Sequence, residues 1–478
     1  MNSDVDVASV PQLHRALGTL DLVLLNVAAI VGLRWLSVAA QIGPSSLTLW
    51  AAGMIAFLIP SALTVLELSS RLPGEGGVYI WSKAAFGDLH GFIAGWSYWI
   101  ANLVFFPSLL LFAASVLLYV PGGSWLALAD NPVYNGVVSL AILWSATLIN
   151  IVGLERAKWL QNAGGMATWL VGALILCGGV VAWYRFGAAT PIAARALLPD
   201  VKSVATLASF ATIALAYSGL ELGPILGGEI KNPRRTIPRA LLIACVTIAA
   251  LYIAGTAALF AALPTEQINS ISGVPQALAA VAARVGAPMV GTAAAVLLMV
   301  ASVGALGAWV TGTARLPFLF GLDRYLPKAL GAVHPKFGSP HVALLTQAVL
   351  TTVVLLAAIS GSAVREAYAV LIDMTVILTL LPLLYMYAAL PMLRRRAPGG
   401  HPGVMMIPGG PFVCWLVAGS GFTVALLAVL FAMVPPVAST NRTLFAVKVI
   451  GGSALLIGAG LAFYFRGRRP PPRPRWSK

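Results

Sequence analysis

Two charged side chains lie inside apolar segments of this 478-residue sequence, each close to a glycine. Arg34 follows Gly32 in one segment, and Glu221 follows Gly219 in another, with Pro224 three residues further on. A charged side chain at the centre of a membrane helix costs about 2.5–3.5 kcal/mol on insertion scales, and such residues are functional by default. Glycine and proline weaken a helix, so both segments are predicted to be interrupted helices.

The predicted interruptions offer chemistry that complements a small zwitterion. Main-chain N–H and C=O groups cannot stay unpaired in lipid, so an unwound stretch is expected to line a cavity or bind a ligand. Gly32 and Gly219 let a ligand approach the backbone closely. Amides of the half-helix after Gly32 suit a carboxylate, and carbonyls before each break suit an ammonium group. An amino acid carries both groups.

Two structural roles compete with this interpretation. Glycine is common in membrane helices, because small residues let helices pack closely. An internal salt bridge between Arg34 and Glu221 would also explain both charges without a ligand. The sequence alone leaves these alternatives open.

The composition indicates an integral membrane protein. Hydrophobic residues make up 59% of the chain, charged residues only 9%, and the mean hydropathy is +0.90. Soluble domains carry about 25% charged residues. A membrane helix needs about 20 apolar residues. Twelve segments are predicted to span the membrane, namely 17–43, 47–70, 91–120, 133–152, 159–184, 204–228, 239–263, 289–322, 341–360, 366–393, 412–434 and 445–465.

The formal net charge of +15 is interpreted as a topology signal rather than as a surface for nucleic acid. With the N-terminus inside, most of the 30 Lys and Arg residues fall in loops on the cytoplasmic side, as the positive-inside rule requires. Both termini are therefore expected in the cytoplasm, and a bacterial inner membrane is the expected location. The basic tail is expected to be attracted to anionic membrane lipid, and no nucleic-acid partner is expected.

No cofactor, metal site or catalytic centre is predicted. Cys177, Cys245 and Cys414 lie far apart in apolar segments, so neither a disulfide framework nor a thiolate metal site is expected. The five histidines lack metal-ligand spacing. Paired carboxylates and nucleophile motifs are also missing, so the chain is not expected to be an enzyme. The first sixteen residues do not have the order of a removable signal peptide.

The positions of the two predicted breaks indicate an internal repeat. They fall in the first and sixth segments, and because five is odd, a second five-helix unit must enter the membrane in the opposite sense. Interrupted helices at matching places in inverted repeats point to the binding site of a transporter. The expected organisation is an N-terminal segment at 1–16, repeats at 17–202 and 203–396, two further helices at 397–465 and a basic cytoplasmic tail at 466–478.

Four stretches of the sequence resemble one transporter family. They are 217–239 at the end of the sixth segment, 67–79 after the second, 313–328 at the end of the eighth and 407–411 before the eleventh. Together they are similar to the amino acid–polyamine–organocation (APC) superfamily. The resemblance covers almost the whole chain and implies an all-α membrane protein with twelve transmembrane helices. It implies a five-plus-five inverted repeat of the leucine-transporter type, followed by two C-terminal helices, and alternating access with amino acid or polyamine substrates.

The resemblance also implies which residues surround the substrate, because it places segments one, three, six and eight at the site. The arrangement of Glu221 resembles that of bacterial glutamate/GABA-type antiporters. In the first break, the family's glycine-serine-glycine signature is reduced here to Gly32 with Arg34. In the fifth segment, Thr168 stands where proton-coupled members often carry lysine. The predicted substrate-binding residues are Ile30, Val31, Gly32, Leu33, Arg34, Asn102, Phe105, Tyr217, Ser218, Gly219, Glu221 and Trp309.

The favoured hypothesis is a secondary transporter of amino acids, either an exchanger or proton-coupled, with Glu221 as the coupling residue. The alternative is a polyamine or organic-cation transporter of the same fold. A membrane-embedded sensor or enzyme is disfavoured, because no soluble domain is predicted. At the cytoplasmic end, Glu67 and Arg71 are predicted to form an i,i+4 ion pair, and Arg315 is predicted to snorkel or to pair in a gate.

Overall fold

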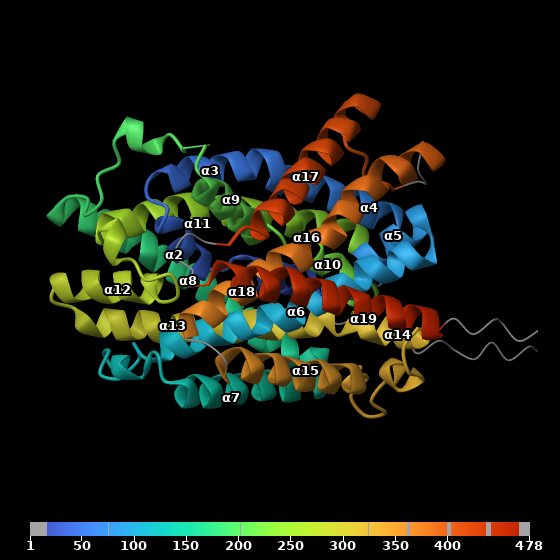
Figure 1. Ribbon diagram of the computed structural model, residues 1–478, viewed down its shortest axis with the longest axis horizontal. Helices are drawn as coiled ribbons and strands as arrows, with labels where there is room; N and C mark the ends of the chain where they lie inside the picture. The colour runs from blue at the N-terminus through green and yellow to red at the C-terminus, as the bar shows by residue number, and fades with distance from the viewer. Residues whose placement is uncertain are drawn as a thin grey trace, which may run out of the picture.

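The fold is a bundle of long apolar helices. The computed structural model describes residues 17–74, 76–200, 202–323, 325–360, 364–398, 403–435 and 441–467. Within these ranges, eleven helical stretches have the length and hydropathy of membrane spans. Most of them run along the long axis of the molecule (Figure 1). The expected all-α membrane fold is confirmed.

The first predicted segment is an interrupted helix. It consists of α1 (Thr19–Ile30) and α2 (Arg34–Ala40), which are separated by residues 31–33. The helical pattern ends at Val31, whose ψ of 79° is not helical. The break predicted at Gly32 is therefore confirmed.

The sixth predicted segment is interrupted as well. It consists of α9 (Val204–Ala216) and the short α10 (Leu222–Ile225), separated by residues 217–221. Within the break, Gly219 has a φ of 116°, which residues with a Cβ rarely adopt. Neither piece is as long as a membrane span, so this segment is not among the eleven stretches.

The other ten predicted segments also form helices, with bounds that agree with the prediction within a few residues. Two of them contain a π-helical turn, η1 (Met54–Leu58) in the second segment and η7 (Val447–Gly451) in the last. The helices of these segments are α3 (Ser45–Gly53), α4 (Ile59–Arg71), α6 (Asp88–Leu117), α7 (Pro132–Ile151), α8 (Leu154–Phe186), α11 (Pro233–Ala262), α13 (Pro288–Thr313), α14 (Arg315–Leu322), α15 (His341–Ser360), α16 (Val364–Arg396), α17 (Gly410–Ala432), α18 (Arg442–Ala446) and α19 (Gly452–Gly467).

Two short helices outside the spans were not predicted. α5 (Val78–Phe86) follows the second segment, and α12 (Gly273–Arg284) follows the seventh. They lie at opposite ends of the bundle (Figure 1). Both are too short to cross a bilayer, so a search for long apolar runs passes over them. Short 3₁₀ turns lie in the connections, at η2 (Leu126–Leu128), η3 (Ala194–Leu197), η4 (Gly227–Glu229), η5 (Thr265–Gln267) and η6 (Lys328–Gly331).

Glycines bring α8 into close contact with both α1 and α13. A Cβ on Gly164 would lie 2.5 Å from the Gly304 Cα, and a Cβ on Gly165 would lie 2.5 Å from the Leu24 carbonyl oxygen. These distances are far below a normal contact, so only glycine allows the helices to cross so closely. The crossing with α1 fixes the position of the first interrupted helix in the bundle.

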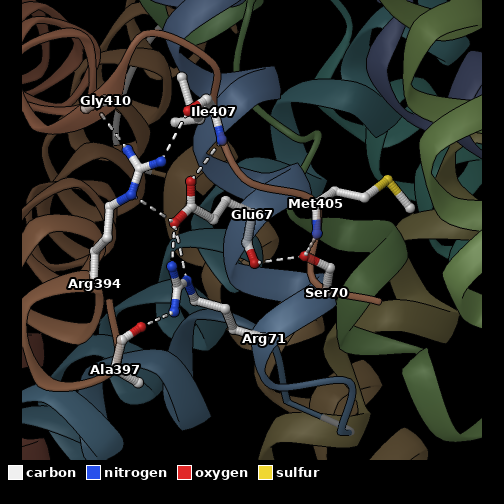
Figure 2. A network of polar contacts seen from close by, with 8 residues as sticks. All are labelled: Glu67, Ser70, Arg71, Arg394, Ala397, Met405, Ile407 and Gly410. Atoms are coloured by element: carbon white, nitrogen blue, oxygen red, sulfur yellow. Dashed lines mark hydrogen bonds and ion pairs between the residues drawn. The ribbon is translucent and has the colours of Figure 1, made fainter. Parts of the chain in front are cut away.

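A buried ion-pair network joins α4 and α16 to the segment before α17 (Figure 2). Glu67 has no exposed surface, and its Oε1 lies 2.8 Å from Arg71 Nη2 and 3.5 Å from Arg394 Nε. The Oε2 of Glu67 accepts a hydrogen bond from Ile407 N–H at 2.8 Å. Arg71 also donates to the Ala397 carbonyl, and Arg394 donates to the Ile407 carbonyl. The predicted Glu67–Arg71 pair is confirmed, and it is part of a larger network.

Candidate functional site

One tyrosine hydroxyl joins the two interrupted helices. Tyr252 is buried on α11, and its hydroxyl oxygen lies 2.9 Å from the Ile30 carbonyl oxygen and 3.1 Å from the Ala216 carbonyl oxygen. The same oxygen accepts a hydrogen bond from Gly32 N–H at 3.1 Å. Because a hydroxyl has one proton, it donates to one of the two carbonyls at a time. The two breaks therefore lie next to each other, although they are far apart in sequence.

Side chains of the protein also cover other main-chain polar groups at the breaks. The Trp309 indole N–H donates to the Ala29 carbonyl oxygen at 2.8 Å. The Gly219 N–H donates to Glu221 Oε2 at 3.1 Å. We expected such groups to be left for a ligand, and for the groups named here that expectation is wrong in this conformation. Each of them has a partner within the protein.

A small cavity lies between the breaks and side chains of α6, α13 and α16. Its volume is about 20 Å³, which is enough for one water molecule and too small for an amino acid. Five of the predicted site residues come together in its wall. They are Ile30, Asn102, Phe105, Ser218 and Trp309, and the other lining residues are Ala29, Trp35, Leu215, Ala216, Thr375 and Thr379.

A second cavity of about 20 Å³ lies along the first break. Its wall contains the other four predicted residues of that break. They are Val31, Gly32, Leu33 and Arg34, and the remaining lining residues are Leu109, Phe112, Thr168, Leu298, Ala301, Ser302 and Ala305. Both cavities are as small as a single water molecule, so this part of the protein is in a closed conformation.

Arg34 is a buried cation in the wall of the second cavity. It is 2% exposed, and its guanidinium carbon lies 4.5 Å from the Trp35 ring centroid and 4.4 Å from the Phe105 ring centroid. Its Nε and Nη1 have no hydrogen-bond partner among the described residues. Among the residues that the structure describes, no salt bridge joins Arg34 to Glu221. The internal ion pair, which the sequence left open, is not formed.

Glu221 instead holds the sixth break together. It is 1% exposed, its Oε1 accepts a hydrogen bond from the Tyr98 hydroxyl at 3.0 Å, and its Oε2 accepts the bond from Gly219 N–H. Tyr98 belongs to α6, so the carboxylate links that helix to the break. Glu221 lines neither of the two small cavities.

The last two predicted residues, Tyr217 and Gly219, lie beside the cavities rather than in their walls. The Tyr217 hydroxyl donates to the Trp50 carbonyl oxygen at 3.0 Å. A Cβ at Gly219 would lie 3.2 Å from both the Ile30 and the Trp309 side chains. Gly219 therefore allows the two breaks and Trp309 to pack together.

Several residues at the site were not predicted. Thr375 and Thr379 lie four residues apart on α16, so they share one face of the helix. Two hydroxyls at that spacing in an apolar segment are a signal that the sequence analysis did not use. Tyr98 and Tyr252 carry no such signal, because each lies alone on a continuous helix and acts through contacts distant in sequence.

A larger polar cavity lies at the predicted cytoplasmic end. Its volume is about 500 Å³, and residues 152–156 and 335–339 form much of its wall. Glu229 and Arg315 also line it, with Arg315 Nε 2.7 Å from Glu229 Oε1 and Arg315 Nη2 3.0 Å from Glu229 Oε2. Both side chains are buried. Arg315 was predicted to snorkel or to pair, and it pairs, which joins η4 to α14.

A further ion pair joins α5 to the end of α14. Lys83 Nζ lies 2.8 Å from Asp323 Oδ2, and the Tyr79 hydroxyl also donates to Asp323. Burial lowers the pKa of Lys83, but the hydrogen bond to Asp323 and its negative charge outweigh burial, so the net pKa shift is upward. Lys83 therefore keeps its charge at neutral pH.

Comparisons with known proteins relate the chain to membrane transporters. A sequence model of the amino acid permease family matches residues 17–455. An uncharacterised transporter of Legionella pneumophila is 30% identical over 93% of this chain and 95% of its own length. A glutamate/gamma-aminobutyrate antiporter of Lactococcus lactis is 24% identical over 86% of this chain and 82% of its own. A probable agmatine/putrescine antiporter of the same species is 24% identical over 83% of each chain.

A solved structure has the same fold. The crystal structure of MhsT in complex with L-phenylalanine aligns with a TM-score of 0.65 over 89% of this chain and 98% of that chain. The two sequences are 16% identical, so the likeness concerns the fold alone. It supports the leucine-transporter-type fold that the resemblance implied. With a family match that covers nearly the whole chain, the protein is a member of the amino acid permease family within the APC superfamily, and thus a secondary transporter rather than an enzyme.

Proposed function

We propose that this permease carries amino acids across the cytoplasmic membrane by alternating access. The observation that supports the proposal is the meeting of the two breaks at Tyr252, beside the cavity lined by Ile30, Ser218 and Trp309. Interrupted helices at the interface of inverted repeats are where such transporters bind their substrates. Nine of the twelve predicted residues line this cavity or the second one.

The closed conformation suits one stage of such a cycle. The cavity at the breaks is too small for a substrate, and the Glu229–Arg315 pair lines the larger cavity at the predicted cytoplasmic end. In this proposal the ion pair is a cytoplasmic gate. Separation of η4 from α14 would open a path from the larger cavity toward the breaks.

The direct test is counterflow with the purified protein in liposomes. Vesicles are loaded with one unlabelled amino acid or polyamine, and accumulation of the labelled compound is followed at two pH values, with and without sodium. Protein-free liposomes serve as the control. We expect accumulation for at least one amino acid, and the absence of counterflow for every amino acid would refute the proposal.

We propose Glu221 as the coupling residue. Its carboxylate is buried, accepts hydrogen bonds from Tyr98 and Gly219, and forms no ion pair among the residues that the structure covers. Protonation would remove its charge and occupy one acceptor oxygen, which would weaken its hold on the sixth break. The variant Glu221→Gln keeps the shape without the charge, so its uptake is expected to lose its dependence on pH between 5 and 8. Unchanged pH dependence in this variant would exclude the coupling role.

The second candidate function is polyamine transport, which is favoured by the similarity to the probable agmatine/putrescine antiporter. The cavity walls argue against it, because the side chains that line both cavities include no carboxylate. Counterflow of putrescine that neutral amino acids do not inhibit would establish this function instead. The location in a bacterial inner membrane with both termini in the cytoplasm is part of the proposal, and reporter fusions to each terminus test it.

A further inference from the structure

The unpaired guanidinium of Arg34 is the starting point. An arginine side chain stays charged at any physiological pH. This one is 2% exposed, lines the second cavity, and leaves Nε and Nη1 without hydrogen-bond partners. An unpaired charge in a buried site is unfavourable, so such a group calls for an anion that the described part of the chain does not supply.

Two further buried hydroxyls, on α2 and α16, also lack partners among the described residues. Ser37 lies one helical turn further along α2, and its Oγ is buried without a hydrogen bond. The hydroxyl of Tyr368, on α16, is likewise buried, and no hydrogen-bond partner for it lies among the residues that the structure describes. A guanidinium whose Nε and Nη1 both offer unpaired N–H donors is suited to a carboxylate.

The charge of the site can be read from the walls of both cavities. Among the described residues that line these walls, Arg34 is the one whose side chain is ionised at neutral pH, and the polar lining groups of the first cavity, such as Asn102, Ser218 and Thr375, are neutral. Glu221 lies outside both walls and its oxygens already accept hydrogen bonds. The walls of the two empty cavities therefore carry a net charge of +1.

Acceptors for an ammonium group are less available. The carbonyl oxygens of Ala29, Ile30 and Ala216 already face donors, namely the Trp309 indole and the Tyr252 hydroxyl. A substrate ammonium would have to compete with these donors or use the remaining lone pairs. The preformed part of the site is thus the part that binds the negative charge.

We propose that Arg34 is the receptor for a substrate carboxylate, and that the permease prefers substrates with a net charge of −1, which are amino acids with two carboxylates. This inference rests on the proposed function and names its substrate class. A dicarboxylic amino acid neutralises Arg34, whereas a neutral amino acid leaves the loaded site with its excess charge. A polyamine would bring further positive charge beside a buried cation, which selects against it.

Two size-matched pairs of amino acids test the preference. Counterflow by the wild-type protein is measured with L-glutamate against L-glutamine and with L-aspartate against L-asparagine. Within each pair, an amide replaces one carboxylate and the side-chain volume hardly changes. We expect at least tenfold higher initial rates for the acidic member of the better pair. Equal or higher rates for the amide member would overturn the inference and leave the proposed function standing.

Two variants test the role of Arg34. Arg34→Met removes the charge but keeps a long apolar side chain between Trp35 and Phe105. Counterflow of the acidic amino acid is expected to fall at least tenfold in this variant. The rate of Arg34→Lys is expected to be intermediate, because lysine keeps the positive charge but lacks the paired N–H donors of the guanidinium. The matched control is Arg395→Met, since Arg395 is exposed and also stacks on an aromatic ring, Trp415 at 4.9 Å. Wild-type rates are expected for this control.

Thermal melting separates binding from transport and from folding. A ligand that binds the folded protein raises its melting temperature. L-glutamate or L-aspartate is expected to stabilise the wild type but not Arg34→Met, while the ligand-free variant melts no lower than the wild type, because an unpaired buried charge has been removed. Stabilisation of the wild type, but not of Arg34→Met, by the acidic amino acid would support the inference even if no counterflow were seen. A ligand-free Arg34→Met that melts lower and still binds the acidic amino acid would refute it.

Discussion

The ion pair between Glu229 and Arg315 gives the sharpest prediction about the transport cycle. Two charge-assisted hydrogen bonds of 2.7 and 3.0 Å join side chains that are both buried. Each such bond contributes about 1.5–3 kcal/mol. If opening of the gate breaks both, then Glu229→Ala removes about 3 kcal/mol from the closed state relative to the open state. Because about 1.4 kcal/mol changes an equilibrium constant tenfold, the fraction of protein in the open state should rise about 100-fold.

The assay measures access from the cytoplasmic side to a cysteine behind the gate. Cys177, Cys245 and Cys414 are first replaced by alanine. Asn26→Cys is a suitable reporter, because Asn26 is 1% exposed on α1 and its Oδ1 lacks a hydrogen-bond partner. The rate of alkylation by a water-soluble maleimide is compared with and without Glu229→Ala, in membranes that expose the cytoplasmic face. The expected increase is about 100-fold, set by the open fraction.

The matched control is Glu366→Ala, which breaks an ion pair of the same kind at an exposed place. Lys448 Nζ lies 3.2 Å from Glu366 Oε1, and the two side chains are 32% and 42% exposed. Exposed pairs contribute about 0–1 kcal/mol, so this variant should leave the alkylation rate nearly unchanged. An alkylation rate in Glu229→Ala that equals that of the control would refute the role of the pair as a gate.

Three further predictions concern the elements that support the site. Gly304→Ala places a Cβ 2.4 Å from the Gly164 Cα, so α13 must move away from α8, and unfolding in detergent should show a loss of about 1–3 kcal/mol. Glu67→Ala leaves two buried arginines around a missing carboxylate and should cost about 3–5 kcal/mol in the same assay, whereas Glu67→Gln should cost less because it still accepts the Ile407 N–H. Gly219→Ala adds a Cβ at a φ of 116° and against Trp309, so counterflow should fall more than tenfold while purified protein is still obtained. Wild-type stability in the first two variants, or wild-type counterflow in the third, would contradict the packing described here.

The spans and the breaks could be predicted because their signals are local. The predicted segment 341–360 has the bounds of α15, since an uninterrupted apolar run of that length can only cross the membrane. Gly32 and Gly219 mark the breaks for a similar reason. Each removes a side chain at a point where the helix does not continue.

The partners of the site residues could not be predicted, because they depend on contacts between distant segments. Nothing near Tyr252 in the sequence indicates that its hydroxyl meets both breaks, and nothing near Glu229 indicates Arg315. The expectation of bare main-chain groups failed for this reason. It considered the broken segments alone, whereas the groups of Ala29, Ile30, Gly32 and Ala216 are covered from α11 and α13. The Gly219 N–H is covered from within its own break, by Glu221.

The shared hydroxyl of Tyr252 has a consequence for the direction of flux. It touches Ile30, Gly32 and Ala216, so any movement that draws α1 away from α9 strips partners from main-chain groups in a region without bulk water. The polar ends of a cargo molecule can replace those partners, but an empty carrier has no replacement. Unloaded protein should therefore reset slowly, so exchange of one solute for another is expected to run faster than one-way delivery.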